Sequence, residues 1–150
     1  MAAAGLEAIR KRSPQADNWQ EEITRLQKPD GIYGKGAGMA RDTAGAVVAL
    51  LRLGGRVENR ERVIQVIKAG QRTDGGYGKQ DAASSDLETS YRVVRALIML
   101  KEKPADPGRC RAFVARCRNP DGGYGAAPGQ PFSAGTTYFA TIILHWLAEK

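Results

Sequence analysis

The sequence is poor in the residues that staple small domains or cross membranes. Its 150 residues include only two cysteines, too few for a disulfide framework. Cys110 and Cys117 are seven residues apart, which on one helix separates them by about 10 Å along the axis, beyond the reach of an internal bridge. The longest apolar stretch, residues 138–147, contains His145, so no membrane-spanning helix is predicted.

A leader of the secretory kind is also missing. Residues 1–6 are small and weakly apolar, and the basic residues 10–12 follow them, which reverses the charged-then-apolar order of a secretory signal. We expect a cytoplasmic chain if the sequence is complete, and otherwise the compartment stays open. Residues 1–15 are predicted to form an N-terminal extension or a short capping helix, centred on residues 3–10.

The composition is that of a folded domain with a basic surface. Hydrophobic residues make up 42% and charged residues 26%, as in ordinary globular proteins. The formal net charge is +7, but no dense basic run is interleaved with aromatic residues. We therefore interpret the basic excess as a solvated exterior and expect no nucleic-acid partner.

A five-residue pattern, Asp-Gly-x-Tyr-Gly, occurs three times and sets the organisation of the chain. It occupies residues 30–34, 74–78 and 121–125, so its copies are 44 and then 47 residues apart. This period fits two helices with two connections. We predict a single domain at 16–150, built from three repeats that span about 16–56, 57–104 and 105–150.

Two kinds of helix are predicted within each repeat. The stretch before each turn carries one apolar stripe at helical spacing, formed by Trp19, Ile23 and Leu26, by Val63, Val66, Ile67 and Gly70, and by Cys110, Phe113, Val114 and Cys117. The stretch after each turn, at 43–53, 89–100 and 136–147, is apolar on nearly every side. The fold class is therefore all-α, with buried inner helices side by side and outer helices wrapped around them.

Helix boundaries follow from capping residues. Asp42, Asp86 and Thr136 are predicted as N-caps of the inner helices. Gly54-Gly55 and Lys103-Pro104 are predicted as stops.

The repeated turn is predicted to be structural. Its glycines, Gly31, Gly75 and Gly122, supply left-handed backbone, and its carboxylates, on Asp30, Asp74 and Asp121, accept hydrogen bonds from nearby backbone N–H groups. Its aromatic rings, on Tyr33, Tyr77 and Tyr124, are expected to pack between repeats, with each hydroxyl reaching water or a carbonyl. A phosphate cradle is the alternative, but the glycine spacing matches no such motif and no strand precedes it.

These residues resemble a known family. The elements Gln27-x-x-x-Gly31-x-Tyr33 and Gln71-x-x-x-Gly75-x-Tyr77, and the stretch Leu-Glu-Thr-Ser-Tyr at 87–91, are similar to prenyltransferase/squalene-cyclase repeats. The resemblance covers about residues 16–150. It implies an α–α toroid whose inner helices surround an apolar cavity, as in protein prenyltransferase β-subunits, triterpene cyclases and complement-like thioester domains.

The resemblance does not extend to the reactive groups of that superfamily. Of the zinc-binding Asp, Cys and His of protein prenyltransferases, the matching positions supply only Asp42, while the second repeat has Thr89 and Tyr91 there. The Asp-rich acid motif of triterpene cyclases and the thioester sequence are missing. We therefore expect neither a metal nor a cofactor. Asp42 and Glu88 remain candidate catalytic acids, with helix capping as the alternative.

The inner helices supply candidate ligand-binding residues. Tyr91, Tyr138, Phe139 and Trp146 would form an aromatic wall suited to an isoprenoid chain. Arg92 and Arg95 interrupt an apolar helix and would bind an anionic head group; alternatively, they reach solvent or pair with Asp86 or Glu88. His145 is expected in a core or interface position.

The number of repeats bears on assembly. The resemblance implies rings of about five or six hairpins, and this sequence has three. We expect two chains to complete a six-hairpin ring as a homodimer, with a fragment or capped ends as alternatives. The favoured function is binding of an isoprenoid or other hydrophobic molecule without catalysis. The alternatives are a prenyl-transferring or terpene-cyclising enzyme whose site a partner chain completes, and a protein-interaction repeat.

Overall fold

The computed structural model describes residues 12–148. The helix predicted around 3–10 lies outside the described residues. Within the described part the chain forms α2 (Ala16–Arg25), η1 (Gly36–Gly38), α3 (Met39–Arg52), α4 (Arg60–Ala69), α5 (Leu87–Met99), α6 (Pro107–Arg116) and α7 (Ala134–Trp146). Between residues 12 and 148, β-type pairing is limited to isolated bridges. The predicted all-α class is confirmed.

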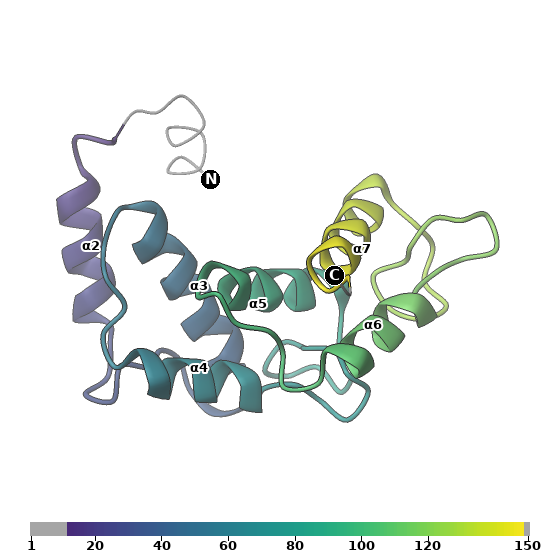
Figure 1. Cartoon of the computed structure of the whole chain (residues 1–150), viewed down its shortest axis with the longest axis horizontal. Coiled ribbons are helices and arrows are strands. Elements are labelled where there is room, and N and C mark those ends of the chain that lie inside the picture. Colours follow the sequence, from purple (N-terminus) through teal and green to yellow (C-terminus); the bar gives the residue numbers. More distant parts are fainter. Residues whose placement is uncertain (1–11, 149–150) are drawn as a thin grey trace.

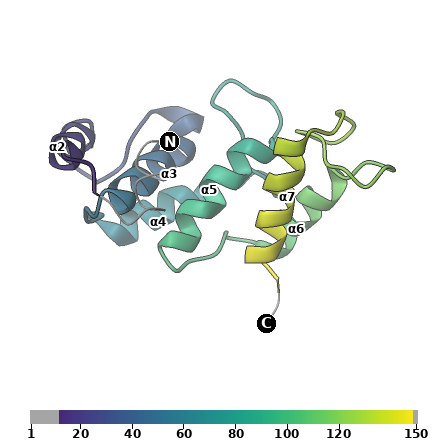
Figure 2. The same cartoon turned by 90° about the horizontal axis from the view of Figure 1, so that it is seen from above.

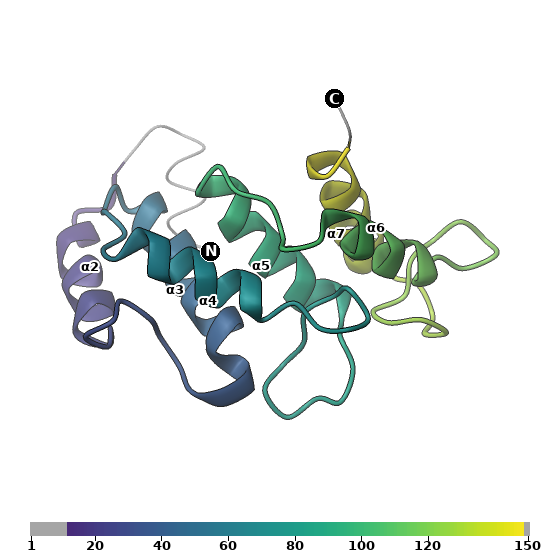
Figure 3. The same ribbon diagram turned by 60° about the horizontal axis from the view of Figure 1, so that its bottom comes forward.

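The helices form two layers in an open arc. α5 packs between α3 and α7 to give an inner layer, and α4 packs on α3 and α5 while α6 packs on α7. Figure 1 shows α2 at one end of the molecule and the α6–α7 pair at the other. Seen from above, α3, α5 and α7 follow one another along the arc (Figure 2), and from below α4 and α6 lie in front of them (Figure 3). The predicted arrangement of inner and outer helices is therefore confirmed, but α7 at the end of the arc buries only Ala140 and Ile143 and is not the buried helix that was predicted.

The core lies between these layers. Val47, Leu97 and Ile143 of the inner helices are fully buried, and so are Ile67 and Phe113 of the outer helices. Each such side chain contributes about 1.5–3 kcal/mol through the apolar surface that it removes from water. Burial of the apolar stripes thus holds the two layers together.

Only one of the three predicted N-caps is confirmed. The Asp86 carboxylate accepts a hydrogen bond of 2.7 Å from the backbone N–H of Thr89. Asp42 is not a cap, because α3 begins at Met39, directly after η1, and Asp42 lies in its first turn. Thr136 is not the cap either, because Ser133 precedes α7 and forms a reciprocal capping box with it.

The helix ends show why one predicted stop is right and the other wrong. Gly54, with φ of +80°, follows α3 as expected. α5 ends at Met99, before Lys103-Pro104, because Lys101 adopts the left-handed conformation with φ of +57°. The N–H of Glu102 then bonds to the carbonyl of Leu97 at 2.8 Å, the long bond of a Schellman motif. A lysine here does what glycine does after α3.

Across residues 12–148, no helix has both the length and the apolar character that crossing a membrane requires.

Candidate functional site

The three repeated turns have the same local geometry. In each, the aspartate Oδ1 accepts a hydrogen bond from the backbone N–H two residues later, at 3.4 Å for Asp30, 3.0 Å for Asp74 and 2.9 Å for Asp121. The following glycines have φ values of +84°, +90° and +89°. The turns therefore build corners between helices, and in each the N–H two residues after the aspartate is engaged within the protein.

Partial burial by itself would raise the pKa of Asp74. Hydrogen bonds from the Ser85 hydroxyl and from the backbone N–H groups of Gly76 and Ser85, together with the nearby Arg116, outweigh burial and lower that pKa below its ordinary value. The hydrogen bonds of the turn thus stabilise the ionised form of the Asp74 carboxylate.

A second bond in each turn was missed by sequence reasoning. The backbone N–H of the turn tyrosine donates to a hydroxyl on the following inner helix, and these hydroxyls belong to Thr43, Ser90 and Thr137 at 3.0, 2.9 and 3.1 Å. The detectable signal was a hydroxyl residue at a similar distance after each tyrosine.

The tyrosine hydroxyls differ from the expectation. Tyr77 is 1% exposed, and within the described residues its hydroxyl and that of Tyr33 have no hydrogen-bond partner. Burial raises the pKa of the Tyr77 hydroxyl far above its ordinary value. The Tyr33 and Tyr77 rings therefore lie deeper in the core than predicted, whereas Tyr124 of the third turn is half-buried.

Four aromatic side chains meet between α5 and α7, and we call Tyr91, Tyr138, Phe139 and Trp146 the aromatic cluster. The Tyr91 ring stacks on Phe139, with centroids 4.7 Å apart, and on Trp146, with centroids 5.5 Å apart. Phe139 and Trp146 are two helical turns apart on one face of α7, so α5 inserts Tyr91 between them. Tyr138 lies 5.9 Å from Tyr91 in a tilted arrangement.

The aromatic cluster is an accessible surface with cationic groups beside it. Tyr138 is 52% exposed, and the other three members are half-buried. Burial and the neighbouring Tyr138 hydroxyl raise the pKa of Tyr91 to about 12, and Arg52 of α3 partly opposes this shift. The Arg95 guanidinium carbon lies 5.9 Å from the centre of the Tyr91 ring, within cation–π range.

The remaining candidates lie along the inner helices. Arg92 pairs with Glu88 at 2.6 Å on the exposed side of α5, as the alternative expected, and its role toward a ligand stays a prediction. The Asp42 carboxylate lies 3.6 Å from the Arg41 guanidinium at the start of α3. The two candidate acids therefore come from different helices, each beside an arginine.

Potential metal ligands are dispersed. Cys110 and Cys117 are buried free thiols of the third outer-helix segment, and burial raises their pKa values to about 12 and about 11. His145 is exposed on α7, which corrects the predicted core position, while the interface position stays a prediction. In the part of the chain that the structure describes, no three His, Cys, Asp or Glu side chains gather closely enough to hold a metal ion.

Two hollows lie away from the aromatic cluster. One, of about 470 Å³, runs along α2 and is lined by Asp17, Gln20, Glu21, Thr24 and Arg25. The other, of about 380 Å³, lies between α4 and the start of α3. Neither has a member of the aromatic cluster in its lining.

Comparison with known proteins gives one family. The model of the prenyltransferase alpha-alpha toroid domain matches residues 1–150. Drimenyl diphosphate synthase from Streptomyces showdoensis is 30% identical over 142 residues, covering 86% of this chain and 26% of that protein. Protein farnesyltransferase subunit beta from Arabidopsis thaliana is 29% identical over 133 residues, covering 81% of this chain and 27% of that protein. The chain spans about a quarter of the length of these relatives.

Proposed function

The chain belongs to the prenyltransferase α–α toroid family, and from that premise we propose that it binds an isoprenoid or other hydrophobic molecule on the inner-helix face without catalysing a reaction. The ligand lies against the aromatic cluster, with its anionic end, where it has one, toward Arg92 and Arg95.

The observation that supports this proposal is the stacking of Tyr91 between Phe139 and Trp146 beside a guanidinium. Stacking holds the rings in place, and the exposed Tyr138 ring together with the accessible parts of the other three offers aromatic surface to an unsaturated hydrocarbon chain. The names of the two relatives refer to a drimenyl diphosphate and to a farnesyl group. A hydrocarbon chain with a diphosphate head is therefore the ligand class that the cluster suits best.

The arginines favour a phosphorylated ligand over a neutral one. Arg92 is paired with Glu88 at the surface, and an exposed pair of this kind contributes little stability. A diphosphate offers more acceptor oxygens than a carboxylate and binds guanidinium groups in a bidentate manner. Arg92 is therefore expected to exchange Glu88 for the ligand.

Calorimetric titration tests this binding. Farnesyl diphosphate should bind saturably, and both farnesol and inorganic pyrophosphate should bind more weakly. Tyr91→Ala should reduce the affinity by at least about tenfold, whereas Phe132→Ala should not, although Phe132 is 57% exposed. Absence of saturable binding, or equal losses in the two variants, would contradict the proposal.

An enzyme is the second candidate function. It is favoured by Asp42 and Glu88 in the first turns of α3 and α5 and by relatives named as a synthase and a transferase subunit. Product formed from farnesyl diphosphate with Mg²⁺ or Zn²⁺, and lost in Asp42→Asn or Glu88→Gln, would establish it. If no isoprenoid binds, a protein-interaction repeat is favoured instead.

A further inference from the structure

The turn glycines are the places where one repeat meets the next. A Cβ atom on Gly31 would lie 2.9 Å from the Asn59 Cβ, at the N-terminus of α4. A Cβ atom on Gly75 would lie 2.2 Å from the carbonyl oxygen of Arg109, in the first turn of α6. The start of each following outer helix therefore rests directly on the preceding turn.

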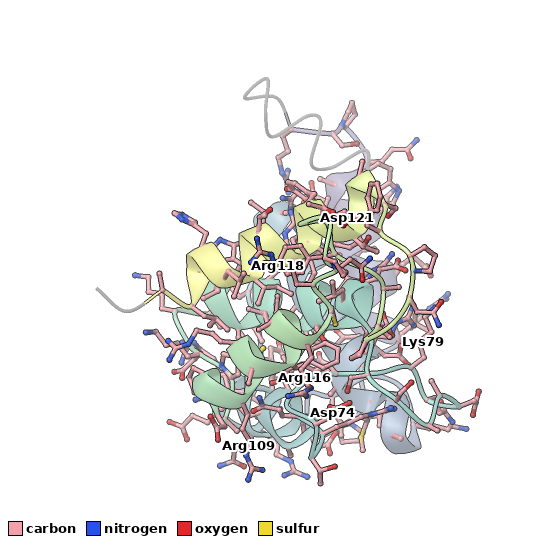
Figure 4. All side chains as sticks on the ribbon, turned by 90° about the vertical axis from the view of Figure 1, so that its right-hand side faces the viewer. Asp74, Lys79, Arg109, Arg116, Arg118 and Asp121 are labelled. Atoms are coloured by element: carbon pink, nitrogen blue, oxygen red, sulfur yellow. The ribbon has the colours of Figure 1, made fainter. Side chains whose placement is uncertain are left out.

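The third turn has the same shape, but among the described residues no following outer helix rests on it, and its contacts are with the loop that leads to α7. Gly122 has φ of +89°, and a Cβ atom there would meet no atom of the described residues within 4 Å. Asp121 and Arg118 beside it are exposed. Figure 4 looks onto this end of the molecule, where both are labelled. Among the described residues, the surface that an outer helix covers at the first two turns is therefore uncovered at the third.

Side chains fasten the joint between the second turn and α6. Gln71 accepts a hydrogen bond from the backbone N–H of Asp106 at 2.7 Å and donates to its carbonyl at 2.8 Å. Arg116 of α6 reaches back and donates to the carbonyl of Asp74 at 2.6 Å. At the third turn, Arg118 takes the place of Gln71 and the carbonyl of Asp121 takes the place of that of Asp74.

We propose that the third turn binds the outer helix α2 of a second copy of this chain, so that copies associate head to tail. α2 and the α6–α7 pair lie at opposite ends of the arc (Figure 1). A head-to-tail contact of this kind repeats the internal joint, and it generates a ring if the arcs close.

A contact that α2 and α6 share sets the register, because Gln20 and Arg111 each lie ten residues before the aspartate of the next turn, whereas the donor of α4 lies about one helical turn earlier. Each outer helix donates a hydrogen bond to the carbonyl at the end of its own inner helix, from Gln20 to Leu53, from Arg60 to Leu100 and from Arg111 to Leu147. Aligned on the donors of α2 and α6, Asn18 matches Arg109 and Arg25 matches Arg116. In the proposed joint, Asn18 of the second copy faces Gly122, and Arg25 donates to the Asp121 carbonyl.

Charge favours the same pairing. α2 carries Asp17, Glu21 and Glu22 against one arginine, whereas α6 carries three arginines and no acid. Arg118 follows α6, and its longer side chain can reach the first turn of a docked helix, where Asp17 lies. Asp17 is paired with Arg12 at the surface, an exchangeable contact because both side chains are largely exposed.

Sedimentation of the full chain over a concentration series tests the proposal. The wild-type chain should form species of two or more copies. Asp17→Arg and Arg118→Glu should each weaken association by at least about tenfold, because each places like charges at the joint. Glu61→Arg and Arg62→Glu are matched controls on exposed positions of the middle outer helix, and they should leave association unchanged.

Mixing the two joint variants gives the sharpest result. In an equimolar mixture, one joint brings Arg118 of the Asp17→Arg variant against Asp17 of the Arg118→Glu variant, as in the wild type. The other joint brings the introduced glutamate at position 118 against the introduced arginine at position 17, and these charges also attract. Association should therefore return. Circular dichroism verifies that each variant is folded before mixing. A monomer at every concentration, controls as damaging as the joint variants, or no recovery on mixing would each overturn the proposal.

Discussion

At the scale of single residues, substitutions at two turn glycines distinguish the cost of backbone strain from the cost of a steric clash. Gly75 and Gly122 have nearly equal φ values of +90° and +89°, but only Gly75 abuts the Arg109 carbonyl. Gly122→Ala should cost about 1–2 kcal/mol of the free energy of unfolding, because an L side chain disfavours this conformation. Gly75→Ala should cost about 1–3 kcal/mol more, because the Arg109 backbone must move. Urea denaturation of both variants measures the difference, and equal losses would show that α6 does not press on the turn.

A second prediction concerns the buried thiols and alkaline pH. Burial raises the pKa of Cys110 from 9.0 to about 12, so the folded chain retains a proton that the unfolded chain loses. The resulting stability is fully present below pH 9 and is lost as the pH rises from there toward 12. The urea concentration at the unfolding midpoint should therefore decrease as the pH is raised from about 8 to about 10.5. A thiol reagent at pH 8 should label Cys110 only after the chain has unfolded. Labelling of the folded chain, or an unchanged midpoint, would contradict this assignment.

The residues of the turn were predictable from sequence only where their partners are local. The aspartate bonds span two residues, so the pattern of Asp30, Asp74 and Asp121 sufficed. Ser90 lies 13 residues after Tyr77, and nothing in the intervening sequence fixes that separation in space. Packing of the loop between them brings the two together, and packing also buries the tyrosine hydroxyl that was expected to reach water.

At the scale of secondary-structure elements, the outer helices hold the ends of the inner ones. Arg60 of α4 donates to the carbonyl of Leu100, where α5 ends. Arg60→Met removes the guanidinium donor and leaves an unbranched apolar side chain in its place. It should lower the free energy of unfolding by about 1–2 kcal/mol. Arg62→Met is the control on the exposed face of the same helix and should change stability little. Equal effects of the two variants in urea denaturation would rule out this capping role.

The spacing of apolar residues predicted which stretches are helical and in which layer each helix lies, but it did not predict where each helix begins and ends. The sequence around Asp42 contains a good capping residue, yet η1 leads straight into α3 and makes a cap there unnecessary. At α7, Ser133 and Thr136 are both suitable residues, and the reciprocal bonds decide in favour of Ser133. Boundaries depend on the conformation of the preceding loop, which periodicity does not encode.

At the scale of the whole molecule, the two-layer arc followed from the contrast between one-sided and all-round apolar helices. The aromatic residues were found by composition, but the insertion of Tyr91 between Phe139 and Trp146 depends on how α5 crosses α7. The sequence pattern does not specify that crossing. The aromatic cluster therefore became a definite surface only with the packing of the inner layer.

Photoaffinity labelling tests most directly the claim that the inner-helix face binds an isoprenoid. A farnesyl diphosphate analogue with a diazirine on its hydrocarbon chain should label peptides from α5 and α7 that contain Tyr91 and Tyr138. An excess of farnesyl diphosphate should suppress that labelling. Label confined to α4 and α6, or label that the excess does not displace, would contradict the account.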